Sequence, residues 1–117
     1  MRKTNFRTEG EAVSYTVGPV DMIPVGEALK VESDDSGAKE DIAIFHAEDG
    51  NFYALQDECT HEVASLSEGW IEDCEVECPL HASRFNLKTG KVLCLPAYVD
   101  ARTYKVEVID GMLELHF

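Results

Sequence analysis

Two short stretches of the sequence each pair a cysteine with a histidine. In "ECTHEV", one residue separates Cys59 from His61, and in "ECPLHAS" two residues separate Cys78 from His81, with sixteen residues between His61 and Cys78. Thiolates and imidazoles bind transition metals, and a thiol next to an imidazole can also act as a nucleophile with its base. The two stretches therefore indicate a metal or cluster site, a thiol enzyme, or a coincidence of four ordinary residues.

The spacing separates these alternatives in part. A thiol enzyme built from one pair leaves the other pair without a purpose. A structural zinc site usually draws on cysteines two to four residues apart. No such spacing involves Cys59, and a Cys74–Cys78 pair would leave Cys59 with only histidines, although zinc stays possible on ligand count. A two-iron cluster fits better, because each stretch can give one thiolate to one iron and one imidazole to the other.

The elements that must position these pairs are expected to be short strands. Nine runs are rich in β-branched and aromatic residues: 13–17, 27–32, 41–47, 51–57, 75–78, 84–87, 91–95, 103–109 and 112–117. Four turn signals lie between them, Asp35-Ser36-Gly37, Asp49-Gly50, Thr89-Gly90 and Asp110-Gly111, and three of the four fit tight hairpins. The only helical turn is expected within "ASLSEGW". The pattern predicts an all-β sandwich or small barrel, with both Cys/His pairs in loops that converge at one end of the sheets.

Length and charge narrow the class of protein. The 117 residues are enough for one domain, 1–117, with a polar tail over about residues 1–12. Neither an apolar signal region nor a membrane-length apolar run is present, so we expect a cytoplasmic protein with reduced thiols and no membrane partner. The 23 acidic and 10 basic residues give a net charge of −13, which disfavours nucleic acid as a partner and favours basic proteins.

The spacing Cys59-x-His61 and Cys78-x-x-His81 resembles the Rieske ligand motif. The resemblance extends to "IPVGEALKVE", "FYALQDECTHEVASLSEGWIED", "EVECPLHASRFNLKTGKVLCLPA" and "TYKVEV". Together these stretches, over about residues 17–117, resemble the small Rieske-type ferredoxins of bacterial multicomponent aromatic-ring dioxygenases, such as those for biphenyl, toluene or carbazole.

The resemblance implies the Rieske fold. This is an antiparallel β-sandwich with a small cluster-binding subdomain at about residues 58–97, formed by two converging loops and a covering proline loop. One [2Fe–2S] cluster per chain is implied, with Cys59 and Cys78 on the inner iron and His61 and His81 on the outer iron. "CLPAY", around Pro96, matches the covering loop, and a proline that simply ends a strand is the alternative.

The implied function is electron transfer and not catalysis. A ferredoxin of this kind takes single electrons from a flavin-dependent NAD(P)H ferredoxin reductase and passes them to a terminal oxygenase, through transient docking as a monomer. The chain shows no glycine-rich dinucleotide fingerprint, and its 117 residues leave no room for a mononuclear iron domain. Two alternatives remain: the Rieske-like small subunit of an assimilatory nitrite reductase, and a zinc-binding module without redox function.

Some positions depart from the family pattern. Respiratory Rieske proteins have a disulfide between the cluster loops, and the matching positions here are Ala64 and Leu80. Ala82 stands where glycine is common, so a positive φ there would strain the loop. High-potential relatives have a serine and a tyrosine that donate hydrogen bonds to sulfur, and here Ser83 keeps a donor whereas Phe85 has none.

The remaining chemistry-bearing residues are expected to be structural. Cys74 and Cys94 lie outside the motif and are interpreted as small apolar fillers. His46 and His116 are expected to be sheet or surface histidines, and Trp70 is expected to pack.

Overall fold

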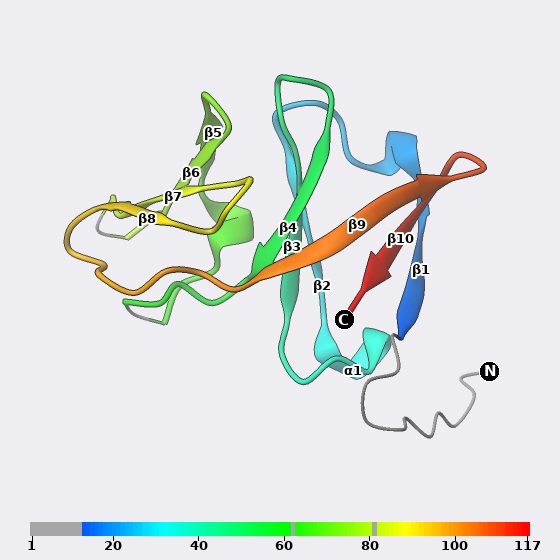
Figure 1. Ribbon diagram of the computed structural model, residues 1–117, viewed down its shortest axis with the longest axis horizontal. Coiled ribbons are helices and arrows are strands. Elements are labelled where there is room, and N and C mark those ends of the chain that lie inside the picture. Colours follow the sequence, from blue (N-terminus) through cyan, green and yellow to red (C-terminus); the bar gives the residue numbers. More distant parts are fainter. Residues whose placement is uncertain (1–12, 62, 81) are drawn as a thin grey trace.

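The fold is described by a computed structural model, which covers residues 13–61, 63–80 and 82–117. The tail expected at residues 1–12 therefore lies outside the described residues. The regular structure of the described chain is almost entirely β-strand (Figure 1). Its strands are β1 (Ser14–Pro19), β2 (Ala28–Val31), β3 (Ile42–His46), β4 (Phe52–Gln56), β5 (Trp70–Glu72), β6 (Glu75–Glu77), β7 (Arg84–Asn86), β8 (Val92–Cys94), β9 (Thr103–Ile109) and β10 (Met112–His116).

Six strands form a large antiparallel sheet in the order β1-β10-β9-β4-β3-β2. This sheet folds over, because Leu113 and Leu115 of β10 pack in one buried cluster with Ile42 and Ile44 of β3. The two halves of the sheet thus face each other across a common core. The expected antiparallel β-sandwich is confirmed.

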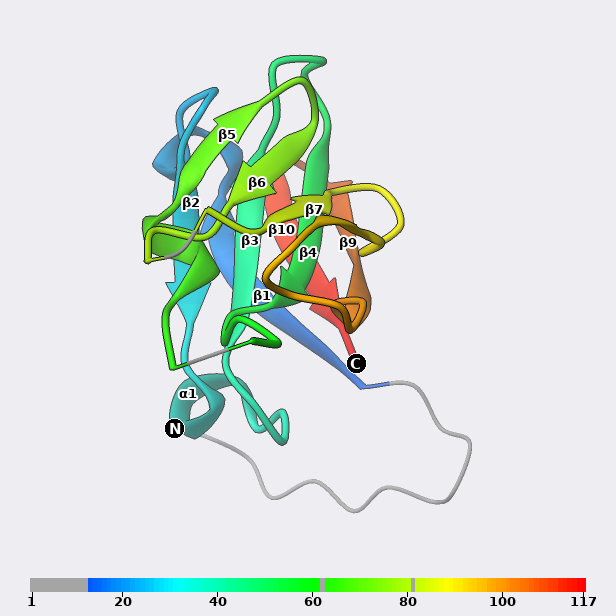
Figure 2. The same ribbon diagram turned by 90° about the vertical axis from the view of Figure 1, so that its left-hand side faces the viewer.

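A second, four-stranded sheet, β5-β6-β7-β8, packs on the outside of this sandwich. Ala43 and Phe45 of β3 point away from the first core and pack with Val76 of β6 and Phe85 of β7. A strand covered on both faces needs apolar residues at successive positions, which explains the run "IAIF" in β3. The small sheet, in front of the sandwich in Figure 2, lies within residues 58–97, where the cluster-binding subdomain is expected.

The three tight hairpins are where the turn signals predicted them, between β3 and β4, β7 and β8, and β9 and β10. Gly90 shows why the second needs glycine. Its φ is +76°, and an added Cβ would lie 2.2 Å from the carbonyl oxygen of Ala101. Only glycine combines that backbone angle with so close an approach to a neighbouring chain segment.

The helical turn expected in "ASLSEGW" is present as the 3₁₀ turn η2 (Leu66–Glu68), but the expectation that it is the only one is wrong. A second 3₁₀ turn, η1 (Val20–Met22), follows β1, and a short α-helical turn, α1 (Ser33–Ser36), follows β2. The latter has acidic residues in its first turn and ends at Gly37, whose φ of 86° is left-handed. Acidic first turns and glycine at the end both favour helix, so the Ser36-Gly37 turn signal belongs to a helix end.

Strand β5 was not expected either. It is three residues long and pairs with β6 through a tight turn at Asp73 and Cys74, both of which have positive φ. So short a strand carries no recognisable period, and its pairing with β6 places it. Among the described residues, no helix is long and apolar enough to cross a membrane.

Candidate metal centre

Cys59 lies in the loop that follows β4. The loop closes on itself, because the amide of Cys59 donates to the carbonyl of Ala64 at 2.9 Å. At its base, the buried carboxylate of Asp57 accepts a hydrogen bond from the amide of Ser67 at 3.0 Å. The Cys59 side chain is thereby turned into the core and is 4% exposed.

Cys78 lies in the loop between β6 and β7. Its amide donates to the carbonyl of Ser83 at 2.7 Å, which closes this loop in the same way. Cys78 is 1% exposed and belongs to the same buried apolar cluster as Cys59, together with Phe45, Val76 and Phe85. Two cysteines from loops far apart in the sequence therefore share one core, because the small sheet packs on the outer face of β3 and β4.

Of the two expected histidine ligands, only His61 lies within the described residues. His61 is exposed, two residues after the buried Cys59. His81 lies outside the described residues, so its position stays a prediction. Within the described residues, no three His, Cys, Asp or Glu side chains come together to hold a metal ion.

A third loop, between β8 and β9, is tied to both cysteine loops. The amide of Ala97 donates to the hydroxyl of Ser83 at 3.0 Å, and the Thr60 hydroxyl donates to the carbonyl of Val99 at 2.7 Å. This loop contains Pro96, preceded by a cis peptide bond. Pro96 thus lies in a loop that fastens the two others together, as the covering-loop interpretation expects, and its place over a cluster stays a prediction.

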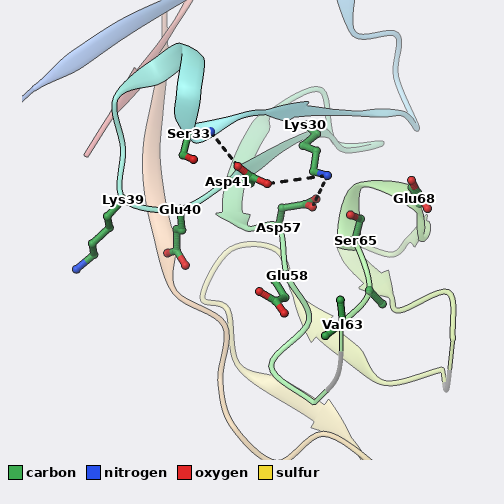
Figure 3. Close-up of a pocket in the computed structure, with 11 residues that line it drawn as sticks. Lys30, Ser33, Lys39, Glu40, Asp41, Asp57, Glu58, Val63, Ser65 and Glu68 are labelled. Atoms are coloured by element: carbon green, nitrogen blue, oxygen red, sulfur yellow. Dashed lines mark hydrogen bonds and ion pairs between the residues drawn. The ribbon is translucent and has the colours of Figure 1, made fainter.

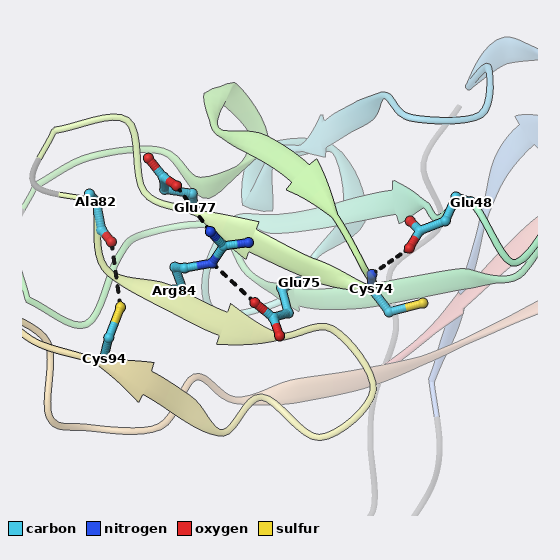
Figure 4. A network of polar contacts seen from close by, with 7 residues as sticks. All are labelled: Glu48, Cys74, Glu75, Glu77, Ala82, Arg84 and Cys94. Carbon is cyan, nitrogen blue, oxygen red and sulfur yellow. Dashed lines mark hydrogen bonds and ion pairs between the residues drawn. The ribbon is translucent and has the colours of Figure 1, made fainter.

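Ala82, at the position where the family commonly has glycine, adopts the left-handed backbone conformation that glycine favours. The φ of Ala82 is +64°, and its amide donates to the carbonyl of Cys78 at 3.2 Å. The Sγ of Cys94 lies 3.6 Å from the carbonyl oxygen of Ala82 (Figure 4). Cys94 is exposed, so the expectation that it fills the core is wrong. Its pairing with Arg84 at the sheet edge, which only the fold reveals, places it there.

Of the other residues expected to be structural, some are placed as expected and one is not. His46 and His116 lie in strands, as expected, with His46 Nδ1 2.7 Å from the carbonyl oxygen of Ile23. Cys74 is half-buried against the core. Burial of its thiol, and to a smaller extent its hydrogen bond to Asp49, raises the pKa of Cys74. Trp70, expected to pack, is 60% exposed, so that expectation is wrong.

A polar pocket of about 620 Å³ opens beside the Cys59 loop (Figure 3). Lys30 reaches across it, with Nζ 4.0 Å from a carboxylate oxygen of Asp41 and 3.8 Å from one of Asp57. At its rim, the hydrogen bond from Arg102 lowers the pKa of Glu40. Lys30 thus pairs with both Asp41 and Asp57 in this pocket. Of the expected ligands that the structure describes, Cys59, His61 and Cys78, none lines it.

The arrangement of two buried thiols beside an exposed imidazole agrees with the comparison to known proteins. The family model described as the Rieske [2Fe–2S] domain matches residues 13–105. The chain belongs to the Rieske [2Fe–2S] family.

Relatives within the Rieske family are close. The chain is 52% identical over 93 residues, 79% of its length and 83% of the relative's, to the 3-phenylpropionate/cinnamic acid dioxygenase ferredoxin subunit of Photorhabdus laumondii. It is 50% identical over 94 residues to the protein of the same name from Escherichia coli K12, covering 80% and 83%. A solved complex of reduced oxygenase and oxidized ferredoxin in carbazole 1,9a-dioxygenase contains a chain 32% identical, with a TM-score of 0.79 and 88% and 92% of the two chains covered.

Membership of the Rieske family confirms two expectations, the fold and the [2Fe–2S] cofactor. The relatives named as ferredoxin subunits confirm a third, an electron-transfer protein and not an enzyme. Family membership leaves the zinc alternative without support. The described residues also fit such a cluster, because two cysteines in one apolar core supply thiolates that water does not reach, whereas His61 stands at the surface.

Proposed function

We propose that this Rieske protein carries single electrons from a flavin-dependent NAD(P)H ferredoxin reductase to the terminal oxygenase of an aromatic-ring dioxygenase system. The observation that carries the proposal is the arrangement of Cys59 and Cys78 in one buried core with His61 exposed beside them. A redox group held there is insulated on one side and accessible on the other, as an electron carrier requires.

We propose Cys59, His61, Cys78 and His81 as the cluster ligands, with the thiolates on the inner iron and the imidazoles on the outer iron. The bound cluster supplies a site that gains and loses one electron. The chain keeps water from the thiolate side, because both cysteines are almost fully buried. The hydrogen bonds of Thr60 and Ser83 to the proline loop hold the ligand loops at a fixed separation, which limits rearrangement during transfer.

The relatives support the oxygenase as the proposed partner. The 3-phenylpropionate/cinnamic acid dioxygenase ferredoxin subunits at 50–52% identity support an oxygenase of that type, which acts on an aromatic acid, as the electron acceptor. The carbazole dioxygenase complex supports direct docking on the oxygenase. We further propose transient docking by a monomer, at interfaces under about 1,200 Å², in the cytoplasm.

The test is the electron paramagnetic resonance spectrum of the dithionite-reduced protein. We expect a rhombic signal with an average g value below that of the free electron, the signature of mixed cysteine and histidine ligation. His61→Ala should abolish this signal, since packing cannot restore an iron ligand. His46→Ala and His116→Ala are matched controls in strands and should keep it.

Two results would contradict the proposal. Zinc in place of iron in the purified protein would remove the redox function. Permanent copurification with a large catalytic chain would instead point to the small subunit of a nitrite reductase. Reduction of the purified E. coli 3-phenylpropionate/cinnamic acid oxygenase by this protein would support the partner assignment directly.

A further inference from the structure

The outer face of the small sheet is covered by no other described element. Ile71, Val76 and Phe85 point inward to the core, so their neighbours along β5, β6 and β7 point outward. We call this surface the outer face; its residues are Trp70, Glu72, Glu75, Glu77, Arg84 and Asn86. Figure 2 shows these strands in front of the sandwich.

Trp70 is the large apolar residue of this face and is 60% exposed. It lies directly opposite Glu77 on β6, and Glu77 immediately precedes the buried Cys78. Trp70 therefore stands at the end of β5 that is nearer the Cys78 loop. An indole that a fold leaves in water at such a position loses the stabilisation of burial, and tryptophan is among the residues most enriched in binding hot spots.

The carboxylates around Trp70 define the chemistry of what it contacts. Glu77 lies across the strand pair and Glu72 follows two residues along on the same face. Arg84, the cation of the face, is held by Glu75 at 3.0 Å and by Glu77 at 3.5 Å (Figure 4). An indole face bordered by carboxylates attracts a guanidinium or ammonium group, through cation–π attraction and charge.

The outer face also continues toward the exposed side of the metal centre. The three loops there expose five apolar side chains: Val63, Leu80, Leu95, Tyr98 and Val99. Leu80 belongs to the same loop that β6 enters at Glu77. A partner that docks over these loops is thus brought beside Trp70.

We propose that Trp70, with Glu72 and Glu77, is an anchor that receives an arginine or lysine side chain of the terminal oxygenase. The inference rests on the proposed function. Charge complementarity points to a basic partner, since the face is acidic and the whole chain carries a net charge of −13. Among possible basic proteins the oxygenase is chosen because a similar ferredoxin has been solved in complex with its oxygenase.

The test measures how the rate of oxygenase reduction depends on ferredoxin concentration, with the oxygenase of the E. coli 3-phenylpropionate/cinnamic acid dioxygenase as the probe. For Trp70→Ala we expect a half-saturating concentration raised by about tenfold, the size of a hot-spot loss, with an unchanged maximal rate and an unchanged cluster spectrum. Ile109→Ala, an exposed aliphatic residue on β9, is the control and should behave as the wild type.

A second variant keeps the test independent of any folding effect of Trp70. Glu72→Lys should raise the half-saturating concentration more than Asp34→Lys, which makes the same charge change on α1, far from the small sheet. The inference is overturned if each variant behaves as its control does. It is also overturned if the variants change only the step in which the reductase reduces this protein. A wild-type protein that cannot reduce the oxygenase overturns the proposed function itself, which distinguishes the two failures.

Discussion

Ser83 links two of the three loops around the proposed metal centre. It is 1% exposed, its carbonyl accepts the amide of Cys78, and its hydroxyl oxygen accepts the amide of Ala97 at 3.0 Å. Because the oxygen is the acceptor in that bond, the hydroxyl proton is left to be donated elsewhere. Hydrogen bonds to cluster or cysteine sulfur stabilise the more negative reduced state, so they raise the reduction potential.

We expect Ser83→Ala to lower the reduction potential by about 40 mV, the equivalent of about 1 kcal/mol for one electron. The wild-type value should lie near the low end of the Rieske range, about −150 mV, since Phe85 offers no second hydroxyl. Protein-film voltammetry measures both. Ser36→Ala is the matched control, because Ser36 is also buried and its hydroxyl also accepts a backbone amide, that of Ala38. A potential that moves equally in both variants would exclude a local effect of Ser83.

Ala82 is held in a backbone conformation that suits glycine. A left-handed φ of +64° costs an L-residue about 1 kcal/mol or more. We therefore expect Ala82→Gly to raise the free energy of unfolding by up to about 1 kcal/mol, measured by chemical denaturation of the cluster-loaded protein. Ala43→Gly, in the middle of β3, should lower it. A loss of stability in Ala82→Gly would mean that the conformation carries no strain.

At the scale of elements, the β6–β7 hairpin presents the Cys78 loop. Arg84 pairs with Glu75 and Glu77, so that one cation lies between two carboxylates in the strands that flank the proposed ligand loop. All three side chains are about one-third exposed, which limits the contribution of the ion pairs to stability to about 1 kcal/mol or less. The electrostatic effect on the nearby redox centre does not need a strong ion pair.

We expect Arg84→Met to lower the reduction potential, because loss of a positive charge disfavours the more negative reduced state. The shift should shrink at high salt, where exposed charges are screened. Lys105→Met removes the same charge from β9, where Lys105 pairs with Glu107, and should leave the potential unchanged. An increase in potential on loss of Arg84 would show that its main effect is on loop geometry.

At the scale of the whole molecule, the net charge of −13 acts over distances longer than any single contact. If the charge steers the protein onto basic partners, added salt should slow electron transfer to the oxygenase. The Debye length falls from about 30 Å at 0.01 M to about 8 Å at 0.15 M, so the bimolecular rate should drop across this range. Stopped-flow absorbance measures it, with an uncharged small reductant as the control. A rate independent of ionic strength would make the acidity a matter of solubility alone.

The sequence by itself determined the features that depend on local spacing. The Cys59–His61 and Cys78–His81 intervals pointed to a two-iron site because ligand reach is set by the residues in between. The hairpins were predictable because Asp-Gly and Thr-Gly pairs favour particular backbone angles regardless of the rest of the chain. The run "IAIF" already carried the composition of a strand buried on both faces.

Only the tertiary structure decided which faces are covered. Tryptophan and cysteine are residue types that often lie in cores. Trp70 and Cys94 nevertheless lie on the two edge strands of a small sheet, whose outer face no other described element covers. The bonds from Thr60 to Val99 and from Ala97 to Ser83 join loops up to 39 residues apart. Such contacts depend on how strands distant in the chain pair and stack, and no local propensity encodes that arrangement.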